Sequence, residues 1–249
     1  MLFHIRPSTK PGVVTEGSFD FKGAYEFSAE GGDWELILFD SGTLTWLIDL
    51  GDVDICLVAG GKTGSTNPGE YGDDIGGKGG EVVNITNQRL SSGAFTATVG
   101  QSDEDTSLVT PDNVTWTART GEGSSAGKPG QDGVLAWGDS QTLLRPGVLY
   151  GAGAGNGSVY DYLGVSYPEG ASGSVGTADD GRPNGYGGSP GHPIGYDGLD
   201  GTGQGGGGGR RAWTTEYHSG TSRSYYVQYD GGKGGSGAIL IRNHKEVSA

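Results

Sequence analysis

Two glycine-rich stretches match known catalytic or ligand-binding motifs, but their surroundings complete neither site. Residues 72–78 have the spacing of a phosphate-binding loop, yet Gly79 stands where the loop needs a hydroxyl for magnesium, and Asp73 and Asp74 would repel phosphate. Residues 123–127 match the Gly-x-Ser-x-Gly string of a nucleophile elbow, which also requires a following helix and a downstream Asp and His. Because 53 of the 249 residues are glycine, such matches are expected by chance. We therefore predict no nucleotide site, no catalytic residues and no enzymatic activity.

Metal binding is a minor alternative that depends on a few aspartates. The four histidines are scattered along the chain without the spacing of metal ligands. Asp197 and Asp200, like Asp179 and Asp180, could hold a calcium ion through carboxylate and backbone oxygens. Neither pair has the alternating ligand pattern of a known calcium loop. We therefore expect a protein without a metal or a cofactor, and keep a calcium ion as the alternative.

The densest group of side chains suited to recognition lies near the C-terminus, between two glycine tracts. Tyrosine and tryptophan offer large, rigid contact areas, and arginine pairs with acidic groups. The alternative is that these rings pack on the glycine-rich body of the protein. The candidate binding residues are Trp213, Tyr217, His218, Arg223, Tyr225, Tyr226 and Tyr229.

The glycine content constrains how this chain can fold. Each glycine loses more backbone entropy on ordering than alanine does, at a cost of roughly 0.5–1 kcal/mol. Only 33% of the residues are hydrophobic, so a small core in a monomer would not offset that cost. Disorder is the alternative, but aromatic residues are spread along the whole chain, which is atypical of disordered segments. We expect dense backbone hydrogen bonding and burial between subunits, and predict a homotrimer.

Alternating apolar residues predict β-strands rather than helices. Phe19, Phe21, Tyr25 and Phe27 occupy odd positions, and further strands are expected at 34–39, 43–48, 53–59 and 238–241. No segment shows a helical apolar period. We predict an all-β fold, a β-sandwich or jelly-roll-like arrangement whose first strands form a meander. The expected parts are an N-terminal arm (1–32), a β-rich domain (33–150) and a glycine-rich region closed by a C-terminal strand (151–249), packed on the β-rich domain.

Glycine recurs at every third residue within the least patterned part of the chain. The first run comprises Gly185, Gly188 and Gly191, and the second comprises the triplet 195, 198 and 201. Three residues per turn is the period of polyproline-II geometry, so these runs predict extended strands that lie side by side and hydrogen-bond through their backbones. The alternative is a flexible linker.

Charge and apolar patterning exclude several partners. The net charge of −14 would repel nucleic acid, and no apolar stretch approaches the roughly 20 residues of a membrane helix. We therefore expect no nucleic-acid binding, no membrane insertion and synthesis in the cytoplasm without a signal peptide. Cys56, the single cysteine, lies in an apolar run and is predicted to be a small buried hydrophobic residue.

The order of several short segments resembles the glycine-rich tail-fibre and tail-tip proteins of tailed phages and prophages. These segments are 41–46 (SGTLTW), 52–61 (DVDICLVAGG), 79–83 (GGEVV), 93–100 (GAFTATVG) and the closing 234–242 (GGSGAILIR). The resemblance implies a trimeric, non-enzymatic virion protein whose glycine-rich loops contact the host surface. The expected partners are other tail or baseplate proteins and a host glycan or surface protein. The alternative is a purely structural virion component, such as a baseplate or capsid decoration protein.

Overall fold

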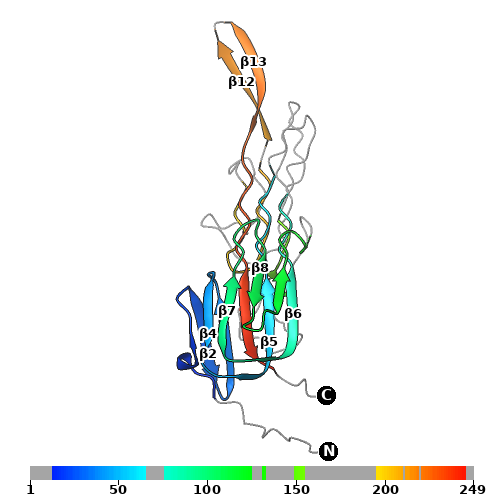
Figure 1. Cartoon of the computed structure of the whole chain (residues 1–249). Coiled ribbons are helices and arrows are strands. Elements are labelled where there is room, and N and C mark those ends of the chain that lie inside the picture. The colour runs from blue at the N-terminus through cyan, green and yellow to red at the C-terminus, as the bar shows by residue number, and fades with distance from the viewer. Residues whose placement is uncertain are drawn as a thin grey trace, which may run out of the picture.

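The computed structural model describes most of the chain in several separate stretches. These are residues 13–65, 76–124, 131–132, 149–154, 195–209, 211–218 and 220–244, with only the backbone described at 131–132, 149, 211–218, 224, 226 and 228. The molecule is elongated: a block of sheets lies at one end, extended glycine-rich segments follow, and a hairpin projects at the other end (Figure 1). Within the described residues, no helix has the length and apolar character needed to cross a membrane.

Two antiparallel five-stranded sheets form the block, which confirms the predicted all-β fold. A single 3-10 turn, η1 (Glu16–Ser18), precedes the first strand, and β10 (Gln131–Asp132) pairs with β11 (Leu149–Tyr150) in a separate two-stranded sheet. The first large sheet has the order β1 (Phe19–Asp20), β4 (Gly42–Trp46), β7 (Gly93–Thr98), β8 (Thr106–Val109) and β9 (Thr115–Ala118). The second has the order β2 (Tyr25–Glu30), β3 (Asp33–Leu38), β14 (Ala238–Asn243), β5 (Leu50–Val58) and β6 (Val82–Leu90).

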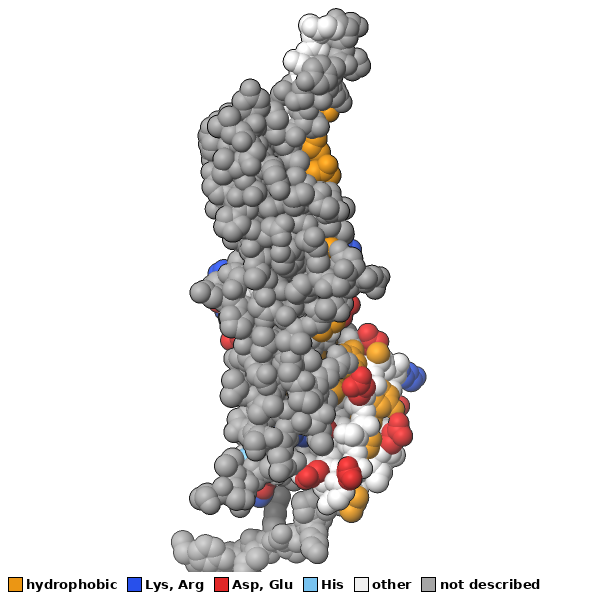
Figure 2. Space-filling view, turned by 180° about the vertical axis from the view of Figure 1, so that it is seen from behind, with side chains coloured by type: hydrophobic (Ala, Val, Ile, Leu, Met, Phe, Trp, Pro, Cys, Tyr) orange, Lys and Arg blue, Asp and Glu red, His pale blue; other side chains and the backbone are white. Residues whose placement is uncertain are grey.

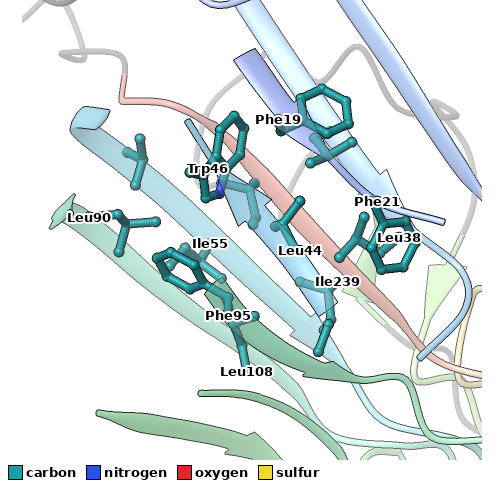
Figure 3. Close-up of a cluster of buried hydrophobic side chains, with 14 of the residues drawn as sticks. Phe19, Phe21, Leu38, Leu44, Trp46, Ile55, Leu90, Phe95, Leu108 and Ile239 are labelled. Carbon is teal, nitrogen blue, oxygen red and sulfur yellow. The ribbon is translucent and has the colours of Figure 1, made fainter. Parts of the chain in front are cut away.

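One apolar core fills the space between the two sheets and makes them a sandwich. Trp46 and Phe95 of the first sheet are almost fully buried together with residues of the second sheet such as Ile55 and Ile239. Figure 3 shows these side chains converging from both sheets. The rings of Phe19 and Trp46 meet edge to face with their centroids 5.4 Å apart. Alternate residues of each strand supply this core, as the period of two predicts.

The C-terminal strand β14 lies in the middle of the second sheet. Ile239 pairs with Leu38 on one side and with Leu57 on the other. The predicted buried strand at the end of the chain is therefore confirmed. β14 lies between β3 and β5 and pairs with both, so the second sheet is complete only when the C-terminal segment is in place.

The chain does not form the predicted meander. β3 belongs to the second sheet and the next strand, β4, belongs to the first sheet. The chain then returns to the second sheet at β5. β1 and β2 also belong to the sandwich, although they fall within the predicted arm of residues 1–32. The meander was wrong because an alternating pattern shows that one face of a strand is buried but does not show which sheet contains it.

The glycine-rich segments form a bundle of extended chains joined by backbone hydrogen bonds. The N–H groups of Gly61 and Gly64 donate to the carbonyl oxygens of Gly235 and Gly232, three residues apart on both segments. Gly232 and Gly235 in turn donate to a further segment, at Gly207 and Gln204. These bonds join segments of one chain that are far apart in sequence, and three residues is the period of polyproline-II-like geometry.

The second predicted glycine triplet takes part in this bundle at two of its three positions. Gly195 and Gly198 donate to the carbonyl oxygens of Asp230 and Lys233, again with a spacing of three. Gly201 lies in a turn with a φ of 75°. The first triplet, at 185, 188 and 191, lies outside the described residues.

Close approach explains why these positions are glycine. A Cβ atom added to Gly206 would lie 2.0 Å from the carbonyl oxygen of Gly232, and one added to Gly61 would lie 1.9 Å from that of Gln204. Both obstacles are backbone atoms, which cannot move aside as the end of a flexible side chain can. Any side chain here would force the segments apart and break the hydrogen bonds between them.

We predict that Gly206→Ala lowers the stability of the bundle much more than Gly17→Ala does. A Cβ at Gly17 would have only the Thr15 hydroxyl nearby, at 3.8 Å, so this variant is a matched control. Overpacking of this kind costs about 1–3 kcal/mol. Thermal unfolding checks the prediction, and equal melting temperatures for the two variants would contradict the tight packing of the bundle.

We predict that Cys56 is chemically inert in the folded protein. It is fully buried in a second apolar cluster with Ile37 and Leu240, and burial raises the pKa of the Cys56 thiol to about 12. Because the thiolate is the reactive form, a thiol-specific reagent at neutral pH should label the protein only after unfolding. Rapid labelling of the native protein would show that this cluster opens.

Candidate functional site

The candidate site is a two-stranded hairpin at the end of the molecule furthest from the sandwich (Figure 1). It consists of β12 (Arg211–His218) and β13 (Thr221–Gln228), which pair in register from Arg211 opposite Gln228 to His218 opposite Thr221. A two-residue connection joins them, and its Gly220 has a φ of 86°, a conformation that favours glycine. In the part of the chain that the structure describes, neither strand pairs with any other strand.

The structure brings most of the predicted binding residues into this hairpin. Trp213 is the cross-strand partner of Tyr226, and Tyr217 is opposite Ser222. Arg223 is opposite Glu216, Tyr225 is opposite Thr214, and His218 is opposite Thr221. Adjacent pairs of an antiparallel ladder belong to opposite faces, so the Trp213–Tyr226 position and the Thr214–Tyr225 position lie on different faces of the ribbon. The predicted cluster is thus divided between two faces.

Exposure is described for three of the predicted residues. The side chain of Arg223 is exposed, Tyr225 is 36% exposed, and Tyr229 is half-buried. Tyr229 follows β13 and lies at the foot of the hairpin, where its carbonyl oxygen approaches Gly209. Tyr225 and Arg223 are therefore open to a partner from solvent.

The glycine bundle holds the two legs of the hairpin together. Residues 203–209 lead into β12, and residues 229–237 lead away from β13. Gly232 donates to Gly207 and Gly235 donates to Gln204 across these legs, at 2.8 and 2.7 Å. The Gly206 N–H also donates to the carbonyl oxygen of Lys62, which belongs to the glycine-rich segment that follows β5. Backbone hydrogen bonds between the two legs therefore hold the base of the hairpin in place.

The aspartates considered as calcium ligands bind backbone groups of the glycine tract instead. Asp197 Oδ1 accepts the N–H of Lys233 at 2.7 Å, and Asp200 Oδ1 accepts that of Ser236 at 2.9 Å. Among the described residues, no group of three or more His, Cys, Asp or Glu side chains is placed to hold a metal ion. Asp179 and Asp180 lie outside the described residues. The chemistry shown for Asp197 and Asp200 is capping of backbone donors.

Asp103 joins the sandwich to the glycine bundle. It lies in the turn between β7 and β8, and its carboxylate accepts the Thr63 hydroxyl at 2.5 Å and the Thr63 N–H at 3.3 Å. The Ser102 hydroxyl lies 3.1 Å from the same carboxylate, and Lys62 Nζ lies 3.5 Å away. Partial burial raises the pKa of Asp103, but the hydrogen bonds from Thr63 and Ser102 and the charge of Lys62 lower it by more. The net result is a lowered pKa, so the folded protein favours the charged form of the Asp103 carboxylate.

A buried group of charged residues on the second sheet was not anticipated from the sequence. The Asp54 carboxylate accepts the Asn87 N–H at 3.0 Å and lies 2.8 Å from His244 Nδ1 and 3.8 Å from Arg242 Nε. Glu35 is the cross-strand neighbour of Arg242 and is also buried. The sequence did contain a signal, since Asp54 and Arg242 interrupt or end otherwise apolar runs.

The hairpin had a signal as well, a Ser-Gly dipeptide between segments rich in threonine and tyrosine.

We predict that Asp103→Asn destabilises the protein at neutral pH and that its effect disappears in acid. A group whose pKa is lowered by folding stabilises the folded state above its unfolded pKa of about 4 and loses that contribution as the pH falls through the folded value. Asparagine keeps the shape and tolerates the φ of 66° at this position. Melting temperatures of the variant and the native chain should differ at pH 7 and converge below about pH 4.

The control for this experiment is Asp112→Asn, which changes an exposed aspartate in another turn. It should leave the melting temperature nearly unchanged at either pH. A difference for Asp103→Asn that persists unchanged in acid would show that the carboxylate charge is not what joins the two parts.

Comparisons of the whole chain with family models, with curated proteins and with solved structures find no match.

Proposed function

We propose that this chain is a non-enzymatic tail-fibre or tail-tip protein of a phage or prophage virion, and that hairpin β12–β13 contacts a receptor on the host cell. The observation that carries the proposal is the position of the hairpin, which projects at the end opposite the sandwich (Figure 1) and contains the chain's densest group of aromatic residues and arginine. The order of the glycine-rich segments, similar to that of phage tail proteins, supports the same function.

The composition of the hairpin indicates the kind of receptor. Tyrosine and tryptophan rings stack on the faces of sugars, and their hydroxyl and indole N–H groups bond to sugar hydroxyls. Arg211 and Arg223 outnumber the single acidic residue, Glu216, between residues 211 and 228, although the whole chain has a net charge of −14. An acidic glycan or another acidic polymer of the cell envelope would therefore be repelled by most of the protein and attracted by the hairpin. We propose this class of receptor.

Assembly strengthens such a contact. A homotrimer would present three hairpins from one end, and linked binding sites reach a higher overall affinity than each site alone. The opposite end, which contains the sandwich, is then the side that faces other tail or baseplate proteins. Trimerisation, these partners and the location in the virion tail remain predictions.

We predict that the double variant Tyr225→Ala, Tyr226→Ala abolishes adsorption without unfolding the protein. Tyr225 is already 36% exposed, so its removal should cost little stability. Each truncated aromatic residue at a binding centre costs about 2 kcal/mol, so adsorption of particles to host cells should fall roughly 100-fold or more. The measurements are the melting temperature of the protein and the adsorption rate of particles that contain it.

The matched control is Thr96→Ala, Thr98→Ala, which changes two exposed residues of β7 on the sandwich. It should leave adsorption unchanged. If the tyrosine variant melts at a much lower temperature, the rings belong to the packing of the hairpin rather than to a binding surface. If adsorption persists at the native rate, the hairpin is not the receptor site, and a purely structural role in the virion becomes the better interpretation.

A further inference from the structure

A groove lies at the sandwich end, where the described chain begins and ends. It has a volume of about 420 Å³ and is formed where β3 and β5 start and β14 finishes. Val13, Trp34 and Leu50 contribute apolar surface, Asp49 and Asp52 contribute carboxylates, and His244 closes one wall. The groove is therefore apolar inside and acidic at its rim.

The most exposed hydrophobic residues lie at the same end of the sandwich as this groove. Among the residues whose side chains are described, the large hydrophobic residues with the greatest exposure are Val13 at 81%, Leu47 at 61% and Val114 at 48%. Leu47 follows directly after Trp46 at the end of β4, and Trp46 pairs with Gly93 at the start of β7. Val114 closes the β8–β9 turn, in which Pro111 lies against Gly93. All three thus lie at the end of the sandwich opposite the hairpin, and Val13 lines the groove itself.

Each of the two aspartates at the rim has a polar partner on a neighbouring segment. Asp49 Oδ1 accepts the Ser92 N–H at 2.7 Å, and hydrogen bonds from Ser92 lower the pKa of Asp49. Asp52 Oδ1 lies 3.3 Å from Arg89 Nε, and that arginine side chain is 85% exposed. Figure 2 shows further acidic side chains over the sandwich. An occupant of the groove should therefore carry apolar side chains next to positive charges.

We propose that the occupant is the N-terminal segment, residues 1–12, of a second copy of this chain. Its sequence, MLFHIRPSTKPG, contains the apolar residues Leu2, Phe3 and Ile5, the bases Arg6 and Lys10, and no acidic residue. The net charge of the whole chain is −14, and the rest of the chain is more negative still because residues 1–12 carry two bases and no acid. The segment thus has the chemistry that the groove requires.

Length and position make an exchange between copies feasible. The segment joins the described chain at Val13, which itself lines the groove, so each copy offers a groove and a segment side by side. Twelve extended residues span up to about 40 Å, enough to reach the corresponding groove of a neighbour. If every copy inserts its segment into the next, the contacts close into a ring, which is the arrangement that a cyclic trimer needs. This inference does not depend on the proposed receptor site, which lies at the other end of the molecule.

The first experiment measures mass by light scattering at micromolar concentration. The full chain should be an oligomer, and a variant without residues 1–10 should be a folded monomer with the far-UV circular dichroism of the native chain. A monomeric full chain overturns the proposal, because any binding of the segment would then occur within one copy. A truncated variant that forms the same oligomer as the full chain also overturns the proposal.

The second experiment measures binding of a fluorescent peptide with the sequence of residues 1–12 to the truncated protein. The control peptide carries Arg6→Glu and Lys10→Glu, and the control protein carries Asp49→Asn and Asp52→Asn. The change at Asp49 keeps a side-chain oxygen that can accept the Ser92 N–H. Binding of the native peptide should saturate, and each control should weaken it at least about fivefold, as expected when exposed charge pairs are lost. Absence of binding, or equal affinity for both peptides, overturns the proposal, whereas loss of adsorption in the hairpin variant would leave it untouched.

Discussion

The structure depends on backbone hydrogen bonds between glycine-rich segments. A buried N–H or carbonyl group is costly unless it is paired, and segments without side chains bring such groups close together. Here Gly61, Gly64, Gly232 and Gly235 satisfy their donors on neighbouring segments at the same spacing of three residues. The entropy lost by ordering glycine is thus opposed by dense pairing within one chain. A side chain at these positions would remove that pairing, since a Cβ atom would reach the neighbouring backbone.

The sandwich and the bundle stabilise each other because the same segments run through both. The segment 229–237 continues directly into β14, and β5 continues directly into the first glycine segment at Ala59 and Gly60. The apolar core fixes β14 between β3 and β5, which sets the register of the glycine residues that precede it. Asp103 adds a contact from the opposite sheet to Thr63. An extended bundle with few side chains therefore obtains its alignment from an ordinary hydrophobic core at one end.

The two ends of the molecule differ in their surface chemistry. The sandwich end has exposed valine and leucine, an acidic groove and the places where the described chain starts and stops. The hairpin end has exposed Arg223 and Tyr225 on a two-stranded ribbon. This separation supports the proposal that the protein is attached at the sandwich end and contacts a receptor at the hairpin end. The elongated bundle between them sets the distance.

The sequence alone determined the class of the fold and the burial of particular residues. Alternating apolar positions identified most strands of the sandwich, and the apolar runs around Cys56 and Ile239 identified two strands of its second sheet, because burial of one face follows from local spacing. The tertiary structure decided which sheet each strand joins, that Asp197 and Asp200 bind backbone N–H groups, and that residues 211–228 form a hairpin. The first two outcomes depend on hydrogen bonds between segments far apart in the sequence, such as Asp197 with Lys233 and Gly61 with Gly235. A glycine tract looks the same in sequence whichever neighbour it pairs with, so only the fold could select the partner.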